Sequence, residues 1–212
     1  MSLRRLVLLR HGETDFNVEA RMQGHLDSHL TEAGLIQIKR AAPLLARLAP
    51  DRLLSSDLRR ATVTADEIAA TTGLPVKIDP RLRETHLGSW EGRTSDEIEH
   101  DRPGAIAHWR SDPTWAPPGG GESRVDVVAR AMPVVTELDE ELAEVSANGD
   151  RMTGLLCAHG GLIAGLTAAL LELPVPNWAS IGGLGNCRWA VLSRRRTSPR
   201  WRLAGYNVGV TE

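Results

Sequence analysis

The sequence predicts an α/β fold of three layers, with helices on both faces of a mostly parallel central sheet. Along the 212 residues, short apolar runs alternate with segments whose apolar residues recur every three or four positions. This alternation is typical of strands connected by amphipathic helices. The first run, Leu6 to Leu9, is unbroken, as expected for a strand covered on both faces. The length suits one domain, residues 1–212, with a single core.

The first half of the chain contains two further strands and two helices. Strands are expected at 52–55 and at 76–78, the latter after the turn Gly73-Leu-Pro75. Thr31 can cap the first helix, and the second begins near Asp57. The buried side of the first helix is expected to carry Leu35, Ile38, Ala42 and Leu45, and that of the second Leu58, Ala61, Ala65 and Ile68.

The middle of the chain interrupts this pattern. Between about residues 87 and 121, prolines, glycines and three tryptophans gather, and only 94–100 and 104–110 are briefly helical. We expect a cap-like insertion, because the segment is too short for a core of its own. Ser123 and Asp126 then form a capping box. The long helix that follows has one apolar stripe, interpreted as core packing: Val128, Ala131, Val135, Leu138, Leu142 and Val145.

The last third completes the sheet. A buried strand is expected at 155–158, a helix from there to about Leu171, and two final strands at 187–192 and 201–206. Between these strands lies a basic segment that contains Arg194, Arg195, Arg196 and Arg200. It is interpreted either as a solvated hairpin tip or as a contact for an acidic ligand.

Composition excludes several classes of protein. Lys and Arg number 25 against 27 Asp and Glu, a net charge of −2, which argues against a general nucleic-acid binder. Two cysteines, Cys157 and Cys187, allow no disulfide framework. No apolar run approaches the ~20 residues of a membrane helix, and the apolar run after Arg4-Arg5 is too short for a signal peptide. We expect a cytoplasmic protein with no membrane contact.

Three clusters of cationic or imidazole side chains adjoin the ends of predicted strands. They are Arg10-His11-Gly12, Arg59-Arg60 and His159-Gly160-Gly161. Ligands of open α/β sheets bind at the carboxyl ends of the strands, where helix amino termini also favour anions. Arginine offers a planar fork of donors to two phosphate oxygens. The clusters therefore predict a phosphate site.

Two of the seven histidines stand out. His11 and His159 each lie between an apolar strand and a glycine, which lets the backbone approach a ligand closely. Either can be a functional or a hydrogen-bonded structural histidine. His25, His29, His100 and His108 are expected to be solvated.

Five ordered blocks resemble the histidine phosphatase superfamily, the phosphoglycerate-mutase-like enzymes. The blocks are Leu8-Leu-Arg-His-Gly-Glu-Thr14, Ser55-Ser-Asp-Leu-Arg-Arg-Ala-Thr62, Leu82-Arg-Glu-Thr-His-Leu-Gly-Ser-Trp-Glu-Gly92, Gly120-Gly-Glu-Ser123 and Ala158-His-Gly-Gly161. They span about residues 6–165. The resemblance implies a phosphoglycerate-mutase-like fold with a short cap.

The resemblance also implies roles for individual residues. His11 would be the nucleophile that becomes a phosphohistidine, and Glu84 would give a proton to the leaving alcohol. Arg10, Arg60 and His159 would hold the phosphoryl oxygens. Asn17, Gln23, Gly24 and Gly160 would line the phosphate pocket and its entrance. No metal or other cofactor is implied.

The substrate is a small phosphate ester. Glu84 and Glu122 are only 38 positions apart, a shorter segment than mutases of the family carry, which favours hydrolysis over phosphoryl return. Stretches outside the catalytic core, such as Thr114-Trp-Ala-Pro-Pro-Gly119, resemble members that hydrolyse glucosyl-3-phosphoglycerate to glucosylglycerate. Trp109, Trp115 or His86 could then contact the glucosyl ring.

Other functions stay open at this stage. They are a broad-specificity phosphatase, a cofactor-dependent phosphoglycerate mutase, a metallophosphoesterase and a non-catalytic phospho-ligand binder. A homodimer is expected from the resemblance, with a contact near Leu170 to Trp178. The basic segment Arg194 to Arg202 differs from the family, and its role in the site is undetermined.

Overall fold

Strand β1 (Leu3–Arg10) lies inside a mixed sheet with the strand order β3-β2-β4-β1-β5-β6. The structure is a computed structural model that describes residues 2–146 and 151–210. Strands β1, β2 (Arg52–Ser55), β3 (Val76–Ile78) and β4 (Met152–Ala158) run parallel to one another. Strand β5 (Trp189–Ser193) pairs antiparallel with β1, and β6 (Arg202–Val208) pairs antiparallel with β5. The predicted mostly parallel sheet is confirmed. Strand β5 begins two residues later than expected, since Cys187 has a φ of 51° and cannot continue an extended strand.

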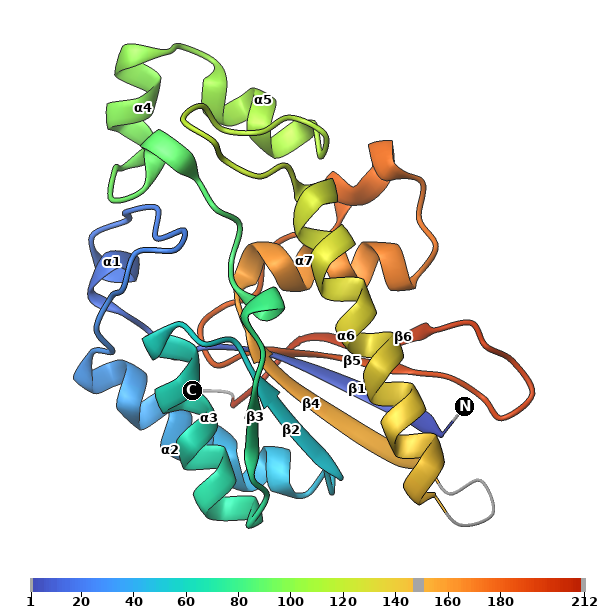
Figure 1. Ribbon diagram of the computed structural model, residues 1–212. Helices are drawn as coiled ribbons and strands as arrows, with labels where there is room; N and C mark the ends of the chain where they lie inside the picture. The colour runs from blue at the N-terminus through green and yellow to red at the C-terminus, as the bar shows by residue number, and fades with distance from the viewer. Residues whose placement is uncertain (1, 147–150, 211–212) are drawn as a thin grey trace.

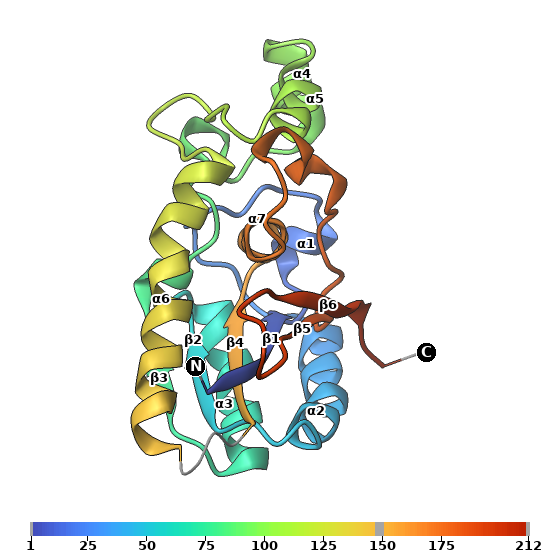
Figure 2. The ribbon, with the colours of Figure 1, turned by 90° about the vertical axis from the view of Figure 1, so that its right-hand side faces the viewer.

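Helices cover both faces of the sheet (Figures 1 and 2). Helices α2 (Glu32–Ala46) and α3 (Arg59–Thr72) pack against Val7 and Leu9, whereas α6 (Arg124–Val145) and α7 (Gly160–Leu170) pack against Leu6 and Leu8. The alternation follows from the two-residue period of a strand. The three-layer architecture is therefore as predicted.

The buried stripes of two helices differ from the predicted ones at their ends. Leu35 is 43% exposed, because α2 makes its first-turn contact through Gly34 and turns the next residue to solvent. Val145 is 57% exposed at the last turn of α6. Helix α3 begins two residues after Asp57, but its predicted buried residues are buried. Helix α6 begins after the predicted capping box, with Ser123 at its N-cap.

The insertion forms a cap over the half of the molecule toward which β1 and β4 run (Figures 1 and 2). It contains a short 3₁₀ turn, η2 (Gly88–Trp90), and the helices α4 (Ser95–Asp101) and α5 (Ala105–Ser111). Leu87, Trp90, Ile98 and Ile106 are buried together there. Trp109 and Trp115 pack against this small cluster, and so does Met22 from outside the insertion, so the cap does not enclose the cluster by itself.

The cap joins the rest of the chain through two adjacent segments, which we call the stem (residues 86–89 and 117–122). The Ser89 amide donates to the Pro118 carbonyl at 2.9 Å, and the Glu122 amide donates to the His86 carbonyl at 2.8 Å. The His86 amide in turn donates to the Glu122 carboxylate at 2.9 Å. The cap thus leaves and rejoins the fold at neighbouring points.

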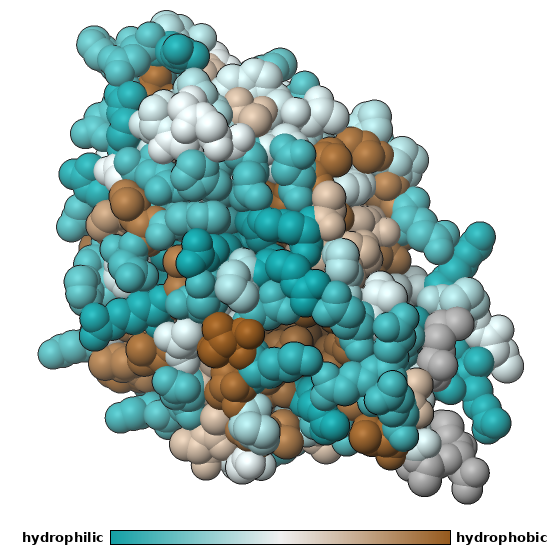
Figure 3. Space-filling view, viewed as in Figure 1, coloured by the Kyte–Doolittle hydropathy of each residue, from teal (hydrophilic) through white to brown (hydrophobic). Residues whose placement is uncertain are grey.

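Three short elements complete the described chain: α1 (Asp15–Val18), η1 (Pro80–Leu82) and η3 (Val175–Ser180). Leu170 and Trp178, which bound the predicted dimer contact, are buried in the chain, the latter against Val128 and Ala168. Leu173 and Val175 between them are partly exposed, and the dimer contact stays a prediction. Polar and apolar residues are interspersed over the face in Figure 3, with apolar surface over the η3 region. Within the described ranges, no helix has the length and apolar character needed to cross a bilayer.

Candidate active site

The three predicted clusters meet where β1, β2 and β4 end. His11 follows β1, His159 follows β4, and Arg60 lies in the first turn of the helix after β2. The centroids of the two imidazole rings are 5.2 Å apart, and Arg60 is hydrogen-bonded to His159. The parallel pairing of β4 with β1 and β2 brings these distant parts of the chain together.

His11 is buried in one defined tautomer. Its Nδ1 lies 2.7 Å from the Gly12 carbonyl, which can only accept, so Nδ1 carries the proton and Nε2 carries the lone pair. Burial, and then the charges of Arg10 and Arg60, hold the pKa of His11 well below its usual range. The ring is therefore neutral at neutral pH, the state that a nucleophile requires.

Arg10 and Arg60 surround the imidazoles with positive charge. Arg10 donates to the Leu184 carbonyl through Nη1, whereas its Nε is buried with no partner in the described chain. Arg60 is 1% exposed and donates to the Gly24 and Leu26 carbonyls, each at 2.8 Å. Burial lowers the pKa of Arg60 to about 10, against the opposing charge of Glu84. It remains a cation at neutral pH.

Both ring nitrogens of His159 are bound within the protein. The Arg60 Nε donates to His159 Nδ1 at 3.3 Å, so the proton lies on Nε2, which donates to the Ser56 hydroxyl at 2.9 Å. Burial and the charge of Arg60 hold the pKa of His159 well below its usual range. His159 thus connects Arg60 to the end of β2. Ser56 lay in a recognised block, but its type alone did not indicate this contact.

Glu84 reaches the site from the loop after η1. Its carboxylate accepts hydrogen bonds from the Gly161 and Leu162 amides, at 2.9 and 3.0 Å, and from the Thr85 amide at 2.8 Å. The first two amides belong to the amino terminus of α7, where unpaired N–H groups favour an anionic partner. The predicted acid therefore lies between the cavity and a helix terminus.

Arg130 clamps the backbone beside Glu84, and the sequence analysis missed it. Its guanidinium donates to the Arg81, Arg83 and Glu84 carbonyls at 2.7 to 2.9 Å. It also makes two hydrogen bonds, 2.8 and 2.9 Å long, to the Glu122 carboxylate. No local signal distinguishes Arg130 from an exposed helical arginine, whereas Glu122 lay in a recognised block.

The loop residues take the predicted places. Asn17, Gln23 and Gly24 line the same cavity as His11. Gly24 has a φ of 54°, and a Cβ there would lie 2.1 Å from the Glu91 carboxylate, so only glycine fits. The solvated assignment of His25 was wrong: it is half-buried, and its Nε2 donates to the Glu84 carbonyl at 2.8 Å. Asn186, which was not predicted, donates to the Asn17 Oδ1 at 2.9 Å.

Two adjoining cavities share Arg10 and Glu84 in their linings. The inner one, about 190 Å³, is lined by Arg10, His11, Arg60 and Glu84 among others. The outer one, about 590 Å³, adds Arg110, Arg124 and Gly160 and shares Trp109 with the inner. Trp115 packs on Trp90 instead, and His86 binds the Gly120 carbonyl, so neither lines these cavities. No three His, Cys, Asp or Glu residues gather as a metal site within the described ranges.

Comparison with known families identifies this arrangement. The model of the histidine phosphatase superfamily (branch 1) matches residues 6–208, which include all three strand-end clusters. The chain belongs to the histidine phosphatase superfamily. The predictions of this family, of its fold and of a phosphatase are confirmed.

Individual proteins give the same picture. Glucosyl-3-phosphoglycerate phosphatase of Mycobacterium tuberculosis is 52% identical over 98% of this chain and 96% of its own. Adenosylcobalamin/alpha-ribazole phosphatase of Salmonella typhimurium is 35% identical over 80% of this chain and 81% of its own. The solved structure of mycobacterial glucosyl-3-phosphoglycerate phosphatase in complex with VO3 has a TM-score of 0.92 at 53% identity, covering 97% of this chain and 100% of that one.

Proposed function

We propose that this histidine phosphatase hydrolyses a phosphate monoester through a phosphohistidine formed on His11. The observation that carries the proposal is the tautomer of His11. The Gly12 carbonyl holds the proton on Nδ1, so Nε2 has a lone pair on a ring that lines the inner cavity beside two arginines. In the first step Nε2 attacks phosphorus, and the bond from phosphorus to the ester oxygen breaks.

Arg10 and Arg60 stabilise the transferring group. At about 4 Å and an effective dielectric of ~20, each pair of unit charges contributes about 4 kcal/mol, which offsets much of the desolvation of a phosphate. The buried, unpaired Nε of Arg10 is one donor available to an oxygen. His159 keeps the Arg60 guanidinium in place through its Nδ1. Its direct contact with the phosphoryl group stays a prediction.

Glu84 serves first as acid and then as base. A dianionic phosphate in the inner cavity favours the protonated carboxyl, which gives its proton to the leaving alkoxide. Such a positioned acid contributes about 10² to 10⁴ in rate for an alkyl ester. The carboxylate then takes a proton from water, which attacks phosphorus and breaks the bond to Nε2. The cycle returns neutral His11 and inorganic phosphate.

The substrate we propose is glucosyl-3-phosphoglycerate, with glucosylglycerate as product. The relatives of that name cover nearly the whole chain at 50–52% identity. Two residues of the outer cavity suit the parts of the substrate beyond the phosphate. Arg124 is half-buried, and within the described chain nothing accepts a hydrogen bond from its guanidinium, which suits the glycerate carboxylate. Trp109 offers an aromatic face to the glucosyl ring.

A panel of phosphate esters tests the substrate. Glucosyl-3-phosphoglycerate should be hydrolysed with a kcat/KM at least tenfold above mannosyl-3-phosphoglycerate, 3-phosphoglycerate and an aryl phosphate. Equal rates would make the enzyme a broad-specificity phosphatase. Isomerisation of 3-phosphoglycerate without phosphate release would make it a mutase.

Trapping the covalent intermediate tests the mechanism. Rapid acid-free quenching after mixing with ³²P-labelled substrate should place label on His11, and H11A should give neither label nor turnover. Undiminished turnover by H11A would refute the phosphohistidine. Phosphate binding without turnover by the wild-type protein would leave only a phospho-ligand binder.

Three further expectations accompany the proposal. Activity should persist in a chelator, since the donors described above need no metal ion. We propose that the chain acts as one domain and as a homodimer in the cytoplasm. With Leu170 and Trp178 buried, a dimer contact at η3 would use the partly exposed Leu173 and Val175. The oligomeric state in solution tests that contact.

A further inference from the structure

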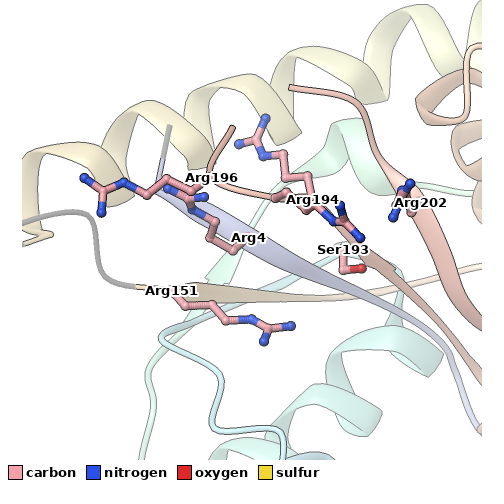
Figure 4. A pocket seen from close by; sticks show the side chains of 7 residues that line it. Arg4, Arg151, Ser193, Arg194, Arg196 and Arg202 are labelled. Carbon is pink, nitrogen blue, oxygen red and sulfur yellow. The ribbon is translucent and has the colours of Figure 1, made fainter. Parts of the chain in front are cut away.

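Six arginines line a second cavity, at the end of the sheet opposite to the candidate active site. Arg4 lies near the start of β1 and Arg151 directly precedes β4, whereas the catalytic residues follow the ends of these strands. The cavity has a volume of about 440 Å³ (Figure 4). Its lining consists of Arg4, Arg151, Ser193, Arg194, Arg195, Arg196 and Arg202. No aspartate or glutamate is among these residues.

Arg4 is a buried cation without a partner in the described chain. It is 9% exposed, and its Nε is buried with no hydrogen-bond acceptor. A buried N–H donor that has no acceptor is costly, and an anion that reaches it relieves the cost. In Figure 4 the Arg4 and Arg196 side chains extend to the same side of the cavity.

Arg194 forms a fixed wall of this cavity. Its Nε donates to the Leu3 carbonyl at 2.6 Å, its Nη2 lies 2.6 Å from the Asp139 carboxylate, and its guanidinium stacks 4.6 Å from the Trp201 ring. These contacts keep the β5–β6 connection against the start of β1. Arg195 and Arg196 follow Arg194 directly and line the same cavity as Arg4.

We propose that this cavity binds a small polyanion that carries two or more phosphoryl groups. Among residues 2–146 and 151–210, carboxylates pair with Arg194 alone of the six, so a single phosphate dianion would leave most of the positive charge uncompensated. Several phosphoryl groups can each accept charge-assisted hydrogen bonds from a different guanidinium. The inference is independent of the proposed function, because none of these residues lines the catalytic cavities.

A small molecule fits better than a nucleic acid or a membrane surface. Arg4 is 9% exposed and lines a cavity of about 440 Å³, which suits a compact ligand rather than an extended surface. The chain as a whole carries a net charge of −2, whereas binders of nucleic acids or anionic lipids present a broad basic surface. The positive charge here is local.

Isothermal titration calorimetry with inorganic triphosphate tests the proposal. The wild-type protein should bind triphosphate with an affinity that falls as salt rises. R4Q–R196Q should bind at least tenfold more weakly, while its kcat/KM for an aryl phosphate stays within twofold of wild type. The matched control is K39Q–R102Q, which removes two positive charges from exposed residues of α2 and the cap. It should bind triphosphate like wild type.

Several outcomes of these titrations would contradict the proposed site. Unchanged affinity of R4Q–R196Q, or an equal loss in the control, would overturn the site, as would binding of RNA or anionic vesicles with none of triphosphate. Circular dichroism checks that the variants fold. If replacing the buried Arg4 prevents folding, R196Q–R202Q changes exposed residues only and should show the same tenfold loss.

Discussion

Replacing Gly161 with alanine should displace the Glu84 carboxyl group without removing it. A Cβ at this position would lie 2.7 Å from the Glu84 Oε1, about 0.7 Å short of ordinary contact, and 3.2 Å from the Thr85 Oγ1. The carboxylate must therefore move away from the Gly161 and Leu162 amides that hold it. Misplacing a reacting group by about 1 Å can cost about 100-fold in rate, so we expect a 10- to 100-fold loss of kcat, about 1.4 to 2.7 kcal/mol.

Comparing esters with different leaving groups shows whether G161A affects the proton donation by Glu84. An alkyl phosphate ester needs a proton on its leaving oxygen, whereas an aryl phosphate does not. In G161A, the rate at which the alkyl ester phosphorylates His11 should therefore fall by the full 10- to 100-fold. The burst of phenol from the aryl ester should stay near normal. Stopped-flow measurement of the burst and of steady-state hydrolysis separates the two steps.

The adjacent glycine provides the control. A Cβ at Gly160 would lie 3.5 Å from the nearest atom, the Arg10 Nε, which is ordinary contact. G160A should therefore lose less than G161A, at most several-fold. Equal losses in the two variants, or an equal loss of G161A in the phosphorylation step with both kinds of ester, would refute the assignment of Glu84 as the displaced acid.

Three further changes test other parts of the site. R124M should raise KM for an ester that carries a carboxylate by about 10- to 100-fold and leave the aryl ester unaffected, as steady-state kinetics on both would show. R130M removes the arginine from the Glu122 carboxylate and should lower the free energy of unfolding by about 2 kcal/mol, measured in urea titrations. It should also change kcat more than KM in steady-state kinetics. Stability should fall as pH falls from about 6.5, because the unfolded chain takes up protons there while the lowered pKa values of His11 and His159 keep the folded histidines neutral. Each histidine contributes up to about 1.4 kcal/mol per pH unit to the pH dependence of the unfolding free energy. Urea titrations at several pH values should therefore show a smaller slope of unfolding free energy against pH for H159Q than for wild type.

The sheet and the strand-end clusters were predictable because their signals are local. An unbroken apolar run followed by Arg10 and His11 indicates both a buried strand and what lies at its end. The same holds for His159 after β4. Parallel pairing then brings such ends together, so the convergence of the site follows from the fold class.

The supporting contacts were not predictable in this way. The carbonyls that Arg130 holds lie more than 40 residues away, and nothing around Arg130 marks it as different from a surface arginine. His25 appeared solvated because its loop is polar, but Arg60 holds the carbonyls on either side of it and fixes the loop against the site. Leu35 was misplaced because the helical period does not show which turn lies nearest the sheet. Such contacts depend on tertiary placement, which residue type does not encode.

The stem of the cap has a consequence for how related enzymes can diverge. Its two segments are held to each other by backbone hydrogen bonds. The cap also contacts the loop after α1, because Met22 packs against the aromatic cluster and exchanges backbone hydrogen bonds with Gly92 and Arg93. A chimera that exchanges residues 90–116 between homologous proteins therefore also needs residues 21–22 from the same parent. Such chimeras would show whether the alcohol portion is recognised through Trp109, as proposed, while the residues that follow β1, β2 and β4 stay unchanged.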